Sequence, residues 1–109
     1  QTCALPISWE GFILEQIFAN MKSNRFVFFY RTHDGAELDL VIEKGGSPVA
    51  GIEIKYGSHF SPSRGNTEAI QTLGIHNNFI IVRDNEDFMH HHFRVCGIKV
   101  FLEKYLPEI

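Results

Sequence analysis

The chain has 109 residues, 44% of them hydrophobic and 13% aromatic, which is enough for one hydrophobic core. The formal net charge of −3 argues against a general nucleic-acid-binding protein, because such proteins are usually basic. No apolar run reaches the roughly 18 residues that span a membrane, and no signal peptide is visible, so we expect a cytoplasmic protein without a membrane partner.

The chain begins at Gln1 and contains no Gly-x-x-x-x-Gly-Lys-Ser/Thr loop. We therefore expect a piece of a larger protein, and this piece is expected to have no ATP site of its own. Residues 1–8 are predicted to be an N-terminal tail or linker, and residues 9–109 a single domain.

Local signals predict a helix and then a strand at the start of this domain. Ser8 is a good helix cap, and the helix is expected to run to about Ser23. Residues 25–31 contain the run Phe-Val-Phe-Phe-Tyr, which favours a buried strand. The apolar stripe of the helix consists, at helical spacing, of Phe12, Ile13, Ile17 and Met21.

Residues 36–56 predict a β-hairpin. In residues 36–42 acidic and apolar side chains alternate, as in a half-buried strand with Leu38, Leu40 and Ile42 on one face. Residues 49–56 form the second predicted strand. Between them, Gly-Gly and Pro mark a tight connection.

The register of this hairpin decides which side chains meet. If the hairpin is centred on Gly46, Asp39 and Glu53 lie directly opposite each other and point to the same face. Lys55 shares the face of Glu53, because side chains repeat every second residue along a strand. Two acids and a lysine are therefore predicted to converge on one patch.

Weaker signals predict the second half of the chain. Residues 78–82 contain a continuous apolar run, Phe79–Val82, as in a strand covered on both faces, and we expect it to join the hairpin sheet in parallel. The other predicted segments are a turn-rich loop over 57–65, a helix capped by Asn66 and running to about His76, an acidic loop from Asp84 to Asp87, a short strand from Phe93 to Gly97 and a closing helix from Ile98 to Leu106.

The predicted patch has a known chemical use. Two carboxylates facing each other repel, and a bound cation would neutralise them. Mg²⁺ takes one or two carboxylates together with waters and substrate phosphate oxygens. A neighbouring lysine can orient the attacking water or balance developing negative charge. The alternative is a solvated strand face on which Lys55 and Arg31 neutralise Asp39 and Glu53.

Other polar residues have competing interpretations. Glu37 lies on the predicted face of Asp39 and is better explained as a structural ion partner than as a ligand. Ser61, Ser63 and Arg64 would hold a phosphate through hydroxyl groups and a guanidinium, or else form an ordinary turn.

The cysteines and histidines do not predict a site. Cys3 and Cys96 lack zinc-ligand spacing and are expected to be buried or half-buried thiols. Three consecutive histidines diverge on either a strand or a helix, so residues 90–92 are expected to form a solvated loop.

Asp39, then Glu53-x-Lys55, after a helix carrying Glu15, resembles the PD-(D/E)xK nuclease superfamily, which has the restriction-endonuclease-like fold. Over residues 9–82 the chain is more closely similar to the C-terminal domain of unknown function that follows an AAA+ ATPase module in many bacterial and archaeal ATPases. The proline that gives the superfamily its name is replaced by Leu38. The segments that carry the closer resemblance are Trp9–Ile17, Arg31–Glu43, Gly51–Tyr56 and Ser61–Gly65.

The resemblance implies an α/β fold with an αβββαβ core and a central mixed sheet flanked by helices. It implies Mg²⁺ or Mn²⁺ held by Asp39 and Glu53, with Lys55 and Glu15 as catalytic residues. Gln71 resembles, weakly, a helix glutamine of some nuclease branches, and a surface role explains it better.

Two functions are therefore expected from the sequence. One is a divalent-metal-dependent nuclease domain that hydrolyses nucleic-acid phosphodiesters. The other is a non-catalytic accessory or partner-binding domain of an AAA+ ATPase, since a fold can be inherited without its activity.

Overall fold

The computed structural model describes residues 8–57 and 60–109 of the chain. The expectation for the Cys3 thiol lies outside the described residues, as does that for most of the predicted 1–8 tail. In chain order the elements are α1 (Trp9–Asn20), β1 (Phe26–Arg31), β2 (Glu37–Lys44), β3 (Ser47–Lys55), α2 (Arg64–Leu73), β4 (Asn78–Val82), β5 (Asp87–His90), β6 (Phe93–Gly97) and α3 (Ile98–Val100), which continues as a π-helical turn, Phe101–Tyr105, and a 3-10 turn, Leu106–Glu108.

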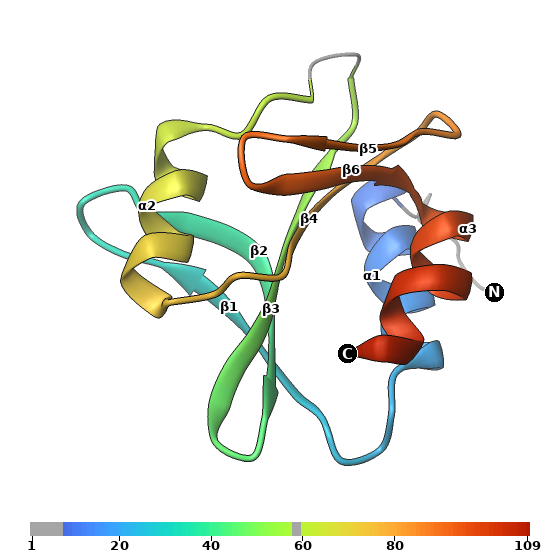
Figure 1. The fold of residues 1–109 in the computed structure, drawn as a ribbon, viewed down its shortest axis with the longest axis horizontal. Helices are drawn as coiled ribbons and strands as arrows, with labels where there is room; N and C mark the ends of the chain where they lie inside the picture. Colours follow the sequence, from blue (N-terminus) through green and yellow to red (C-terminus); the bar gives the residue numbers. More distant parts are fainter. Residues whose placement is uncertain (1–7, 58–59) are drawn as a thin grey trace, which may run out of the picture.

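A six-stranded mixed sheet in the order β1-β2-β3-β4-β6-β5 forms the centre of the fold (Figure 1). Strands β1, β2 and β3 are antiparallel, whereas β4 lies parallel to β3 and β6 lies parallel to β4. The predicted mixed α/β architecture and the parallel placement of the 78–82 strand are thereby confirmed. All five residues of β4 are buried, as its continuous apolar run predicted.

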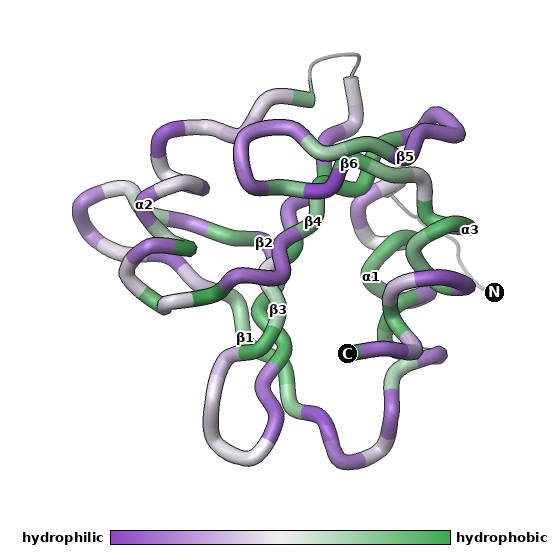
Figure 2. Tube along the Cα trace, in the orientation of Figure 1, coloured by the Kyte–Doolittle hydropathy of each residue, from purple (hydrophilic) through white to green (hydrophobic). Residues whose placement is uncertain are grey.

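Helices cover both faces of the sheet (Figure 1). The α1-side core joins α1 and the C-terminal helical segment to one face through residues such as Ile13, Ile52 and Phe101. The α2-side core joins α2 to the other face through residues such as Ile70 and Ile80. Figure 2 shows hydrophobic residues gathered where the strands cross the centre, while the connecting loops are mainly hydrophilic.

Helix α1 begins as predicted but ends earlier. The Ser8 hydroxyl accepts a hydrogen bond from the backbone N–H of Gly11, which confirms the cap. The helix ends at Asn20, three residues before the predicted end at Ser23. Ile13 and Ile17 face the core, whereas Phe12, which was assigned to the same stripe, is 43% exposed. In the described ranges, no helix combines the length and the apolar character needed to cross a membrane.

Strand β1 is the edge of the sheet rather than the buried strand that its aromatic run predicted. Phe26 and Phe29 are 67% and 70% exposed. Their aromatic and apolar composition indicated a strand, but composition does not distinguish an edge position from a central one.

The second helix starts one turn earlier than predicted. Ser63, not Asn66, is its cap, and the Ser63 hydroxyl accepts the N–H of Asn66. The Asn66 side-chain Oδ1 in turn accepts the Ser63 N–H, so the two residues form a reciprocal capping box. The helix ends at Gly74, whose φ of +68° is the left-handed conformation that favours glycine at this position.

The 84–92 region contains a strand, β5, that the prediction of two loops missed. Asp87 and His90 lie in β5, and His91 and His92 form the turn to β6 with positive φ. A turn of this kind usually carries Gly or Asn, so two histidines do not indicate it. The short strand from Phe93 and the helical closing segment from Ile98 are confirmed.

Candidate metal and phosphodiester site

The β2–β3 hairpin places Asp39 opposite Glu53 through a turn and a compensating bulge. Gly45 and Gly46 form the turn with φ of +59° and +84°, a conformation that side chains disfavour. The pairs Glu43–Pro48 and Ile42–Ala50 leave Val49 without a partner. This extra residue shifts the register so that Leu40 pairs with Ile52, and the next positions along are Asp39 and Glu53.

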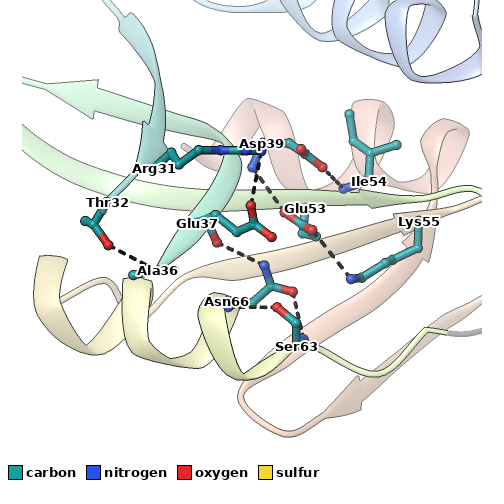
Figure 3. A network of polar contacts seen from close by, with 10 residues as sticks. All are labelled: Arg31, Thr32, Ala36, Glu37, Asp39, Glu53, Ile54, Lys55, Ser63 and Asn66. Carbon is teal, nitrogen blue, oxygen red and sulfur yellow. Dashed lines mark hydrogen bonds and ion pairs between the residues drawn. The ribbon is translucent and has the colours of Figure 1, made fainter. Parts of the chain in front are cut away.

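At these positions side-chain carboxylates, instead of backbone carbonyl groups, accept the hydrogen bonds between the strands. The Asp39 N–H donates to Glu53 Oε1 at 3.1 Å, and the Ile54 N–H donates to Asp39 Oδ2 at 2.8 Å (Figure 3). Each carboxylate thus accepts a backbone N–H of the opposite strand. The regular β2–β3 ladder ends at the pair Leu40–Ile52, so the acids occupy the point where the two strands part.

A second bulge turns Asp39 away from the face of Glu53. Tyr30 pairs with Leu38 and Phe28 with Val41, so Asp39 and Leu40 together oppose Phe29. Strict alternation had placed Leu38 and Leu40 on one face. In the structure Leu38 belongs to the α2-side core and Leu40 to the α1-side core, which corrects that prediction.

The two acids therefore meet from opposite sides of the gap. Asp39 lines a hollow of about 290 Å³ whose lining also includes Glu10 and Leu14 of α1. Figure 3 shows the Glu53 and Lys55 side chains extending toward α2, with the Asp39 carboxylate on the side of Ile54. The predicted shared face holds for Glu53 and Lys55 but is wrong for Asp39, because the bulge changes the phase of alternation.

Glu53 is a buried carboxylate whose ionised form is destabilised by its surroundings. Burial, and secondly the charge of Asp39, raise the pKa of Glu53 to about 7, against opposing contributions from Lys55, the Asn66 side chain and the Asp39 N–H. Lys55 Nζ lies 3.5 Å from Glu53 Oε2, and both side chains are largely buried. A buried carboxylate beside a second acid favours either a proton or a cation as its counter-charge.

Asn66 holds α2 against this site, and sequence reasoning treated it only as a cap. Its side chain is fully buried, donates to the Glu37 carbonyl at 2.9 Å and accepts the Ser63 N–H at 2.9 Å. The Asn66 side chain also acts to lower the pKa of Glu53, against the larger effects that raise it. A buried amide that connects Ser63 to Glu37 indicates a positioning role; the signal in the sequence was only a polar residue three positions after a serine.

The helix glutamate near the site is Glu10 rather than Glu15. Glu15 is exposed, on the same outward side as Phe12 and Ala19. Glu10 lies five residues earlier, on another side of the helix, and burial followed by the charge of Asp39 raises its pKa. Glu15, which was expected to be catalytic, does not approach Asp39 or Glu53, because the helix turns its side chain outward.

The remaining predicted polar residues are engaged elsewhere. Glu37 pairs with Arg31 at 3.1 Å, as expected of a structural ion partner. Ser63 is committed to capping α2, and Arg64 is an exposed partner of Glu68 at 3.4 Å. The Ser61 hydroxyl lies 3.1 Å from His90 Nε2, and Gln71 is exposed on α2.

The histidine tract and the described cysteine form no metal centre. Cys96 is a buried free thiol, and burial raises its pKa to about 12. Within residues 8–57 and 60–109 no three His, Cys, Asp or Glu side chains are grouped so that they could hold a metal ion.

Asp39 and Glu53 nevertheless supply carboxylate oxygens, the kind of ligand that a hard divalent ion prefers. Mg²⁺ keeps several waters and is commonly held by one or two carboxylates. Asp39 Oδ1 accepts no hydrogen bond from the described residues, and Glu53 is the acid whose ionised form most needs a counter-charge. The donor set is suited to Mg²⁺ or Mn²⁺ and lacks the nitrogen and sulfur ligands that zinc prefers.

Comparison with known proteins identifies the family. Residues 7–101 match the model of a family described as Domain of unknown function (DUF4143). The chain is also 45% identical over 69 residues to the uncharacterized proteins Mb2031c of Mycobacterium bovis and Rv2008c of Mycobacterium tuberculosis. The matched region covers 63% of this chain and 15% of each relative. No solved structure matches the chain. With most of its length matched, the chain belongs to the DUF4143 family.

Proposed function

We propose that this domain is a divalent-metal-dependent nuclease of the restriction-endonuclease-like PD-(D/E)xK type, which hydrolyses nucleic-acid phosphodiesters. The observation that carries the proposal is the buried Glu53 carboxylate, paired with Lys55 and facing Asp39 where β2 and β3 part. A structural role alone gives little reason to retain two opposed acids there, since burying a charge costs several kcal/mol (roughly) unless it is compensated.

The residues have distinct roles in this proposal. Asp39 and Glu53 hold Mg²⁺ or Mn²⁺; when bound, such an ion acidifies water and stabilises negative charge on a phosphate. Lys55 holds Glu53 in place and offsets negative charge that develops during hydrolysis. Glu10, rather than Glu15, is the helix carboxylate beside Asp39.

The order of elements supports the proposal further. A helix, three antiparallel strands, a helix and a parallel fourth strand is the order that the nuclease resemblance implies. The aligned region makes up only 15% of each mycobacterial relative. We propose that an AAA+ ATPase module precedes this domain in the full-length protein and delivers the strand to be cut.

Cleavage of labelled single- and double-stranded DNA and RNA, with Mg²⁺ or Mn²⁺, tests the proposal. Asp39→Asn and Glu53→Gln are expected to abolish cleavage and weaken metal binding, because each removes an anionic ligand. Lys55→Ala is expected to retain metal binding and lose turnover. Lys44→Ala, an exposed lysine at the far end of β2, is the matched control and should retain activity.

Cleavage that survives EDTA, or that is unchanged in Asp39→Asn, would refute the mechanism. If the isolated domain cuts nothing, the same assay on the full-length protein with ATP decides whether the proposed ATPase module is required. Absence of cleavage by the full-length protein as well would reject the nuclease proposal.

A partner-binding role is the second candidate, and exposed aromatic residues favour it. Phe26 and Phe29 lie exposed on edge strand β1, and Phe12 and Phe18 lie exposed on α1. Exposed apolar side chains on a sheet edge suit association with another protein segment. Loss of an ATPase–domain contact in Phe29→Ser, with Lys55→Ala unaffected, would support this role over catalysis.

A further inference from the structure

Three side chains lie in contact beside the candidate site, with Trp9 edge-on to Tyr56 and Arg83 over the Tyr56 ring, and we call this group the Tyr56 platform. The rings of Trp9 and Tyr56 lie 5.8 Å apart between centroids at an angle of 75°. The Arg83 guanidinium carbon lies 4.9 Å from the Tyr56 ring centroid. A tyrosine contacted by both an aromatic ring and a guanidinium is a preformed planar surface.

The topology of the sheet brings these residues together. Lys55 and Val82 are paired at the carboxyl ends of the parallel strands β3 and β4. Tyr56 and Arg83 directly follow these two strands, so they lie side by side at the same end of the sheet. Trp9 reaches them from the first turn of α1.

The platform is open to a ligand. Tyr56 is 62% exposed, and its hydroxyl makes no hydrogen bond with any described residue. Arg83 has no carboxylate within ion-pair distance in the described part of the chain. Tyr56 and Arg83 instead line an open hollow of about 370 Å³ together with Gly57 and Asp84. Packing and ion pairing therefore do not account for the exposed ring and the available guanidinium.

The platform lies on the α1 side of the sheet, which is also the side of the Asp39 carboxylate. Tyr56 lies two residues after Ile54, whose N–H donates to the Asp39 carboxylate at 2.8 Å. Two residues of a strand span roughly 7 Å, which is about the separation of successive nucleotides in an extended single strand.

We infer that the Tyr56 platform is a nucleotide-stacking subsite, and that the strand it takes is single-stranded nucleic acid. This inference rests on the proposed nuclease function and names its substrate class. An unpaired base has a free face to stack on the Tyr56 ring, whereas bases inside a duplex are already stacked on one another. The Arg83 guanidinium then lies where it attracts the adjoining phosphate.

Binding of an oligothymidylate of about 12 nucleotides, in EDTA, tests the inference without cleavage. Anisotropy of a labelled strand gives the affinity, and emission of Trp9, the only tryptophan, reports binding at the platform itself. Tyr56→Ala is expected to weaken binding at least about fivefold, and Tyr56→Phe to retain it. Arg83→Gln is expected to weaken binding and reduce its salt dependence.

Two comparisons make the result specific. Phe26→Ala removes a similarly exposed aromatic residue from β1 and should leave binding unchanged. A blunt duplex of the same sequence should bind at least about fivefold more weakly than the single strand. Quenching of Trp9 emission by the strand should saturate together with the anisotropy.

The binding test separates failure of this inference from failure of the nuclease proposal. Single-strand binding that depends on Tyr56 but is never followed by cleavage would uphold the platform and reject the nuclease. Absence of oligonucleotide binding, unaltered affinity in Tyr56→Ala, or a preference for duplex would overturn the platform, whatever the cleavage assay shows.

Discussion

The electrostatics of Glu53 predict a specific pH dependence of stability in the metal-free protein. Burial and the Asp39 charge raise the folded-state pKa from 4.5 to about 7. Between these values the folded protein keeps the Glu53 proton, whereas the unfolded chain has released it. Because the folded state then binds more protons, its free energy of unfolding must fall as the pH rises from about 4.5 to 7.

The size of this effect follows from the shift in pKa. One pKa unit corresponds to about 1.4 kcal/mol, so the full rise amounts to roughly 3 kcal/mol, as an upper figure. The substitution Glu53→Gln keeps the shape of the side chain and removes its titration. The free energy of unfolding of the wild type, relative to Glu53→Gln, should therefore decrease by up to about 3 kcal/mol over this interval.

Urea unfolding in EDTA, at closely spaced pH values from about 4 to 8, measures this difference. Glu68→Gln removes a carboxylate from the outer side of α2 and corrects for the general effect of losing one acid. Parallel curves for the wild type and Glu53→Gln would refute the reasoning, as would a difference that increases with pH. Either result would mean that Glu53 is not a strained buried carboxylate.

Three further predictions concern the framework around the site. Gly65→Ala should destabilise the fold by about 1–3 kcal/mol in thermal unfolding, because the added Cβ would lie 2.2 Å from the Gly35 carbonyl oxygen; an unchanged melting temperature would contradict this contact. Asn66→Ala should lower the free energy of unfolding by about 1–3 kcal/mol in urea, since it leaves buried backbone groups unpaired, whereas a neutral result would deny its positioning role. The Tyr105 hydroxyl, and then basic neighbours, lower the pKa of Asp87 from 3.8 to about 2. The wild type should therefore lose stability as the pH falls through this range, and Asp87→Asn should lack this pH-dependent loss. Acid-unfolding curves of equal steepness for the two proteins would contradict the prediction.

Elements with strong local signals could be predicted from the sequence. Ser8 supplied a cap and Ile13 and Ile17 a buried spacing, so α1 was found with its correct start. The apolar run at 79–82 was long enough to indicate a strand covered on both faces. These features depend on neighbours close in sequence, which is why composition and spacing were sufficient.

The candidate site was only partly predictable because it depends on two bulges. The bulge at Val49 leaves Asp39 opposite Glu53, so the predicted register was right at that point although the turn is centred elsewhere. The bulge opposite Phe29 carries no local signal, and it moves Leu38 and Asp39 out of the predicted alternation. A single inserted position changes every side-chain assignment beyond it.

Tertiary contacts decided the remaining residues. Glu10 and Glu15 are both acids of α1, and only the packing of the helix on the sheet shows which one approaches Asp39. Strand β5 was missed because its turn uses His91 and His92 at positive φ instead of glycine. Such a conformation costs about 1 kcal/mol per residue and is set by the surrounding hairpin.

A calorimetric titration of Mn²⁺ tests the central proposal most directly, at about pH 8, above the Glu53 pKa of about 7. The wild type is expected to bind one ion per chain, and Asp39→Asn to bind it at least about tenfold more weakly, with Asp34→Asn in the preceding turn as the control that binds normally. Equal affinity in the wild type and Asp39→Asn would contradict the proposed role of the opposed carboxylates, as would a wild type that binds no Mn²⁺.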